Sequence, residues 1–151
     1  MSFLRALAVV VFPLSMGCTS VSGQLRGAVA GGPPFTFIPN TCSSGAIHGF
    51  SGVLLQNDGN GERDVAFVYE TVRHERSLRM DHEWIVIVRE RPSGHETTFG
   101  QSECTTFEGN VAPTSVKVNG VRAHSGSMKL TCARDDGARI EGELVFENCS
   151  T

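Results

Sequence analysis

Apolar and polar residues alternate along most of the chain after residue 35, with the two-residue period of β-strands. This alternation predicts strands over residues 35–37, 47–56, 64–73, 82–90 and 97–104. In residues 82–90, Val86 and Val88 fall on one face, while Ile85 and Ile87 fall on the other. A strand with apolar residues on both faces is expected to be covered from both sides.

A hairpin is predicted around Asn119-Gly120, within residues 115–123. Asn-Gly between two strand patterns is the strongest short hairpin signal, because both residues tolerate the positive φ angles of a type I′ turn. The two flanking segments should therefore pair as adjacent antiparallel strands.

A second hairpin is predicted near the C-terminus, with a three-residue loop that ends at Gly137. A type I turn followed by a bulge needs a positive φ angle at that last position, which glycine supplies. This loop sets Met128 opposite Leu144 and Cys132 opposite Ile140, so the apolar faces of the two strands coincide.

The fold class that follows is all-β: a single antiparallel β-sandwich or small β-barrel of about eight strands. Helical signals are weak, and only residues 70–80 have the composition for a helical turn. Residues 18–34 are small, polar and rich in glycine and proline without periodicity, so they are expected to form a flexible tether. The folded domain should then comprise residues 35–151.

The first seventeen residues have the layout of a secretory signal peptide, with Arg5 before an apolar run at residues 6–14. The apolar run is too short to span a bilayer, which takes about 20 residues. It is followed by Leu14-Ser15-Met16-Gly17-Cys18, which resembles the lipobox of bacterial lipoprotein precursors. The pattern departs from the family at Ser15, where leucine is usual, and Ser15 with Gly17 also suits the ordinary signal peptidase.

The resemblance implies cleavage after residue 17, a diacylglycerol and an acyl chain on Cys18, and attachment to a membrane through that lipid. Thr19 follows the cysteine in place of the aspartate that favours inner-membrane retention, so the resemblance implies the outer membrane, on its periplasmic or surface face. It covers about the first twenty residues and implies nothing about the fold or activity of the mature domain.

The cysteine count agrees with lipidation of Cys18. Lipid would consume one of five cysteines and leave an even set, Cys42, Cys104, Cys132 and Cys149, for two disulfides in an oxidising compartment. The predicted hairpin separates Cys132 from Cys149 by nearly 30 Å, at about 3.3 Å per residue, which excludes that pair. Cys42–Cys149 with Cys104–Cys132 is preferred over Cys42–Cys132 with Cys104–Cys149, because Cys42 and Cys149 lie near the ends of the domain.

Candidate chemistry is sparse. His74, Asp81, His82 and Glu83 are the densest titratable cluster, but no two histidines have a recognised metal-ligand spacing. Asp58, Asn60 and Glu62 resemble half of a calcium loop, yet Arg63 replaces its glycine. Ser51 lies in an incomplete nucleophile elbow without a following helix. Tyr69 and Trp84, the only residues of their kinds, are interpreted as core residues.

No catalytic, cofactor-binding or metal-binding residue is therefore assigned. Lys+Arg (13) and Asp+Glu (16) nearly balance, which argues against a nucleic-acid partner. The leading hypothesis is a membrane-anchored lipoprotein that acts as a non-catalytic binding or accessory component of a cell-envelope assembly, with another envelope protein as partner. The alternatives are a small-molecule-binding β-barrel lipoprotein and an inhibitor or immunity-type lipoprotein. An enzyme is the least favoured.

Overall fold

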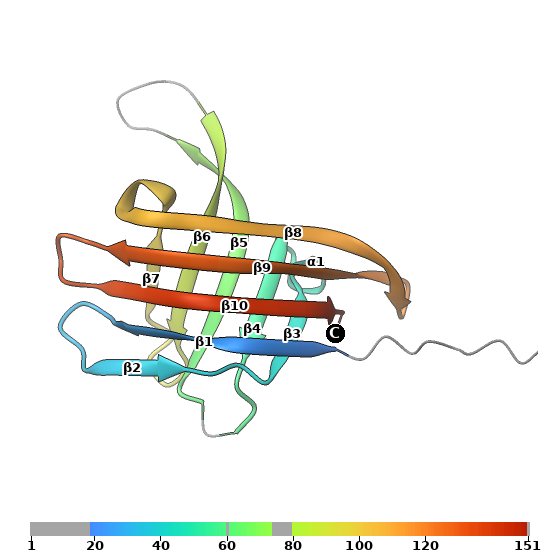
Figure 1. The fold of residues 1–151 in the computed structure, drawn as a ribbon, viewed down its shortest axis with the longest axis horizontal. Coiled ribbons are helices and arrows are strands. Elements are labelled where there is room, and N and C mark those ends of the chain that lie inside the picture. The colour runs from blue at the N-terminus through green and yellow to red at the C-terminus, as the bar shows by residue number, and fades with distance from the viewer. Residues whose placement is uncertain (1–18, 60, 74–79, 151) are drawn as a thin grey trace, which may run out of the picture.

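The computed structural model describes residues 19–59, 61–73 and 80–150. These residues form a β-sandwich of two antiparallel five-stranded sheets that are not closed into a barrel. The strands of one sheet run across those of the other (Figure 1). The fold class is thus confirmed in its sandwich form, with ten strands in the described residues where about eight were expected.

The first sheet, sheet A, has the strand order β2-β1-β10-β9-β8. Its strands are β1 (Ser20–Ala28), β2 (Pro34–Phe37), β8 (Cys104–Val118), β9 (Val121–Ala133) and β10 (Arg139–Cys149). The second sheet, sheet B, has the order β3-β4-β5-β6-β7. Its strands are β3 (Thr41–Ser44), β4 (Gly52–Gln56), β5 (Arg63–Arg73), β6 (Met80–Glu90) and β7 (Glu96–Phe99). A single α-helical turn, α1 (Gly45–His48), and a 3-10 turn, η1 (Gln101–Glu103), complete the described elements.

Both predicted hairpins are present, and the C-terminal one has the expected register. Asn119 and Gly120 have positive φ angles of 51° and 81° between β8 and β9. In the β9–β10 hairpin the backbone N–H of Arg134 donates to the carbonyl of Ala138 at 2.8 Å. Met128 pairs with Leu144 and Cys132 with Ile140, as predicted.

The prediction of a flexible tether over residues 18–34 is wrong for those of its residues that the structure describes. Residues 20–28 form β1, which lies between β2 and β10 in sheet A, with Leu25 fully buried. Glycines suggested flexibility, but Gly23 and Gly27 lie where neighbouring backbone leaves no room for a Cβ atom. The folded domain therefore begins before residue 35, whereas residues 1–17 and Cys18 lie outside the described residues.

Two further segments differ from the expectation. Residues 47 and 48, which were predicted as strand, belong to a helical turn, because the Ser44 hydroxyl caps the turn and Gly49 ends it with φ 84°. Residues 70–73 belong to β5 rather than to a helical turn, since they continue the pairing with β6.

The core lies between the sheets and is filled by side chains from the inward faces of both. Its largest fully buried members include Phe67, Phe99, Phe146, Leu25 and Met128. The two disulfides have the preferred pairing. Cys42–Cys149 joins sheet B to sheet A, and Cys104–Cys132 joins the neighbouring strands β8 and β9.

Candidate functional site

Sheet B has a second apolar surface, on the face turned away from the core. Val68 and Ile85 are 2% and 6% exposed, yet they alternate with the residues that point into the sandwich. Leu54, Ala66 and Ile87 continue this surface across β4, β5 and β6 and are half-buried. The apolar residues on both faces of residues 82–90 are thus explained: one face packs on sheet A, and the other forms an outer groove.

The outer groove is a hollow of about 360 Å³. We define it by its lining: the floor residues Leu54, Ala66, Val68 and Ile87, the wall residues His48 and Phe50, and the rim residues Asp64, Glu70, Arg89 and Glu96. Among the described lining residues, only His48 and Phe50 lie outside sheet B. The groove therefore has an apolar floor, an aromatic wall and a charged rim.

The aromatic wall is fixed by the segment that contains α1. The backbone N–H of Phe50 donates to the carbonyl of Gly45 at 2.9 Å, which folds the ring back over the helical turn. A Cβ atom at Gly45 would overlap the Phe50 ring, so only glycine permits this packing. The His48 ring stacks on Phe50 with centroids 6.2 Å apart and hydrogen-bonds Ser43 at 3.1 Å.

Most of the rim charges are paired. Arg91 donates to Asp64 at 2.8 Å, and this bond raises the pKa of Arg91 above its ordinary value. Arg89 donates to Glu96 at 2.7 Å. Glu70 has no ion-pair partner among the described residues. Within the described part of the chain, Glu70 is thus a rim carboxylate without an ion-pair partner beside an apolar floor.

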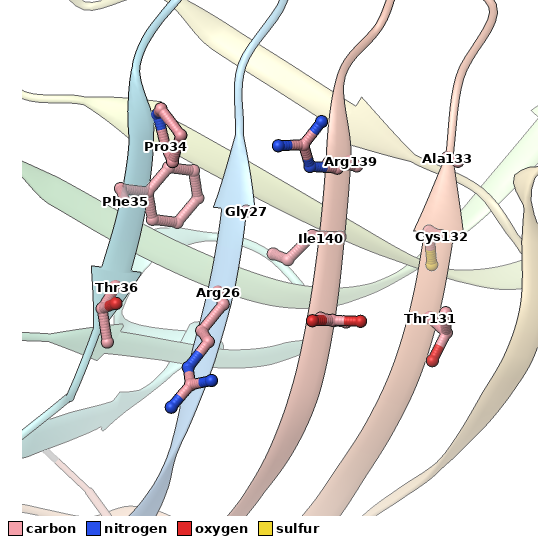
Figure 2. A pocket seen from close by; sticks show the side chains of 11 residues that line it. Arg26, Gly27, Pro34, Phe35, Thr36, Thr131, Cys132, Ala133, Arg139 and Ile140 are labelled. Carbon is pink, nitrogen blue, oxygen red and sulfur yellow. The ribbon is translucent and has the colours of Figure 1, made fainter.

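A different hollow, of about 500 Å³, lies on the outer face of sheet A (Figure 2). Arg26, Thr131 and Arg139 line it, and the Arg26 and Arg139 side chains point in different directions. In the register of β1 and β10, Arg26 lies opposite Glu141, so the charges on this face alternate in sign. Charge of one sign is not gathered in it, and we do not assign it a ligand.

The histidine and acid cluster predicted from the sequence is not assembled as a site in the described structure. His74 lies outside the described residues, and only the backbone of Asp81 is described. His82 stacks on Tyr69 with centroids 5.5 Å apart, whereas Glu83 lies on the opposite face of the strand, paired with Glu70 in the register. Among the described residues no group of three or more His, Cys, Asp or Glu side chains could hold a metal ion.

The calcium-like loop is a turn held by amide side chains. Asn57 Oδ1 accepts from the Gly59 N–H at 3.0 Å, and Asn40 Oδ1 accepts from the Asp58 N–H at 2.9 Å. Asn60 lies outside the described residues, and Glu62 is exposed. A hairpin connection accounts for these polar residues.

Ser51 is exposed in the turn between α1 and β4. A nucleophile elbow places its serine after a strand and before a helix, and here the order is reversed. The structure shows two serine–histidine hydrogen bonds that were not predicted from the sequence. They join Ser43 to His48 and Ser44 to His124, both at 3.1 Å. Ser44 is fully buried and also caps α1, so its hydroxyl is held in the fold rather than offered to a substrate.

Tyr69 differs from its interpretation as a core residue, since it is 42% exposed. Trp84 is half-buried and packs against the core cluster. Both side chains lie on the inward face of sheet B, because they alternate with Val68 and Ile85 along β5 and β6. The β5–β6 pair extends past the edge strand β8 (Figure 1). The pattern of residues could not show this, because exposure depends on where the other sheet ends.

Comparison of the chain with protein-family models, with curated proteins and with solved structures found no match. Across the part of the chain that the structure describes, no helix is long and apolar enough to cross a membrane.

Proposed function

We propose that this protein is a membrane-anchored bacterial lipoprotein whose β-sandwich is a non-catalytic binding component of a cell-envelope assembly. The outer groove carries this proposal. A partly exposed apolar surface rimmed by polar residues suits a protein interaction site, and the floor of this groove spans three strands of sheet B.

The chemistry of the groove limits what the partner offers. The floor of Leu54, Ala66 and Ile87 fits a ridge of apolar side chains, and the aromatic wall adds ring surface of the kind enriched at interfaces. Glu70 fits a lysine or arginine at one end of that ridge. The partner is therefore an envelope protein with a segment that carries apolar side chains and one basic residue.

The proposed lipid anchor and the two disulfides support an extracytoplasmic location. Leu14 to Cys18 resemble a lipobox, and the four remaining cysteines are all engaged in disulfides. Disulfides persist in oxidising compartments such as the periplasm. The lipid on Cys18 would keep the groove near partners in the same membrane.

Photo-crosslinking from the groove tests the proposal. A photoreactive amino acid at position 54 in the full chain, expressed in a bacterial host, should give one adduct with an envelope protein. Its crosslinked peptide should carry apolar residues beside a lysine or arginine. The purified partner should bind Ala66→Arg at least roughly tenfold more weakly, since the substitution fills the floor with a charged side chain.

The matched control is Ala133→Arg, which adds the same side chain at an exposed position of sheet A. It should leave binding unchanged. Equal binding of the Ala66→Arg and wild-type proteins would contradict the groove as the docking site, and an adduct with a second copy of the chain would replace the heterologous partner with self-association.

A further inference from the structure

A third hollow, the aromatic cleft, lies between four strands and the segment around α1. Tyr69 and Trp84 come from β5 and β6, Val111 and Pro113 from β8, and His124 from β9. It is closed by Ala46 of α1, by Phe50 and Ser51 of the turn that follows, and by Gly52 at the start of β4. The cleft has a volume of about 280 Å³.

A row of aromatic rings leads from the core to this cleft and beyond it. The Phe67 and Trp84 centroids are 4.5 Å apart, those of Trp84 and Tyr69 are 5.1 Å apart, and those of Tyr69 and His82 are 5.5 Å apart. Phe67 is fully buried, so the inner end of the row is fixed by the core. The outer end is open to solvent, because Tyr69 is 42% exposed.

The cleft is lined by polar as well as aromatic residues. Its lining residues include Ser51 and Tyr69, which carry hydroxyls, and Trp84, which carries an indole N–H. Among the described lining residues there is no Asp, Glu, Lys or Arg. The His124 ring is held by a 3.1 Å hydrogen bond to the buried Ser44. The cleft thus combines ring surface with groups that can both donate and accept hydrogen bonds.

We propose that the aromatic cleft binds a neutral carbohydrate chain. A sugar ring presents C–H groups that are attracted to the electron-rich faces of aromatic rings, and its hydroxyls both donate and accept. A lining without full charges disfavours ionic ligands, since they would lose hydration without gaining a partner. A proline-rich peptide also docks in aromatic grooves, but its imide nitrogens donate no hydrogen bond to the acceptors of this lining.

The single tryptophan makes the test specific to this site. Trp84 is the only Trp in the chain, so its fluorescence reports on the cleft alone. The full disulfide-bonded protein is titrated with neutral oligomers of N-acetylglucosamine and of α- and β-linked glucose. At least one oligomer should change the emission saturably and shield Trp84 from a neutral quencher.

Tyr69→Ala should weaken that binding roughly tenfold, as expected for loss of an aromatic anchor. Val145→Ala is the matched control, because Val145 is also 42% exposed but lies on the outer face of sheet A. Unfolding midpoints of both variants separate lost binding from lost folding. Tyr69→Phe, which keeps the ring, should retain most of the affinity.

Absence of a saturable response to every oligomer would overturn the proposal, as would a response only to a proline-rich peptide. The outcome is independent of the outer groove. Ala66→Arg, which blocks the groove, should bind the oligomer like the wild-type protein, so either proposal can fail while the other stands.

Discussion

At the scale of single residues, Asp136 shows how one carboxylate fixes a turn. Its Oδ1 accepts from the backbone N–H of Ala138 at 3.0 Å, and its Oδ2 accepts from Arg134 at 2.9 Å. The backbone hydrogen bond, followed by the arginine, holds the pKa of Asp136 below its ordinary value. Arg134 also donates to the carbonyl of Thr98 at 2.6 Å, which ties the turn of sheet A to strand β7 of sheet B.

This arrangement predicts a pH-dependent contribution to stability. A carboxylate with a lowered pKa in the folded state stabilises the fold above its unfolded pKa, and the contribution is lost as pH falls through the folded value. Asp136→Asn should therefore be less stable than the wild type at neutral pH, and the gap should close in acid. Thermal midpoints measured across this range check it, with Asp135→Asn as the neighbouring control. A gap that stays constant with pH would contradict the argument.

At the scale of elements, the segment around α1 positions both proposed sites. Phe50 lines the outer groove and the aromatic cleft, and it packs on Gly45 without room for a Cβ atom. Ser44 begins the helical turn and also holds His124 of β9. A short segment between two edge-side strands therefore sets one wall of each hollow.

Gly45→Ala should move that wall. The added methyl group overlaps the Phe50 ring, and overpacking of this kind costs roughly 1–3 kcal/mol of unfolding free energy. Urea denaturation measures the loss, and Trp84 emission in the native protein should change because the cleft is reshaped. Gly100→Ala is the control, since its new Cβ would meet only ordinary contacts, the nearest at 3.6 Å. Equal stability of the two variants would argue against the role of Gly45.

The features that the sequence predicted are those encoded locally. The Asn119-Gly120 turn and the loop ending at Gly137 carry their own φ requirements, so hairpin register followed from them. No local sequence signal predicts strand β1, because β1 is held in sheet A by pairing with β10, which lies more than a hundred residues away in the sequence. The apolar residues on both faces of residues 82–90 indicated an apolar outer surface on sheet B. The exposure of Tyr69 could not be predicted in this way, because it depends on where sheet A ends.

At the scale of the whole molecule, the two disulfides should differ in how much they stabilise the folded state. Cys42–Cys149 closes a separation of 107 residues, and Cys104–Cys132 closes one of 28. Chain-entropy arguments give about 4.8 and about 3.6 kcal/mol for loops of these lengths. Replacing Cys42 and Cys149 with alanine should thus destabilise the protein by about 1 kcal/mol more than replacing the other pair. Urea midpoints of the two double variants check the order, and a reversed order would contradict it.

The proposed lipid anchor has a consequence for how the sandwich meets the membrane. Only Thr19 separates Cys18 from the first residue of β1, and its hydroxyl donates to the carbonyl of Asn148 at 3.1 Å. A lipid on Cys18 would therefore hold the end of the sandwich that contains the start of β1 and the end of β10 close to the bilayer. The predicted flexible tether would then not separate the domain from the bilayer.

The anchor itself is tested by the intact mass of the detergent-extracted protein, wild type beside Cys18→Ser. We expect a wild-type species that starts at Cys18 and is heavier by a diacylglycerol and an acyl chain, because a lipobox cysteine receives both. The modification should be absent from Cys18→Ser, which has no thiol to receive the diacylglycerol. An unmodified wild-type mass, released with the soluble periplasm, would refute the anchor. It would leave Cys18 as an unpaired thiol beside β1 and shift the search for a partner to one that forms a disulfide there.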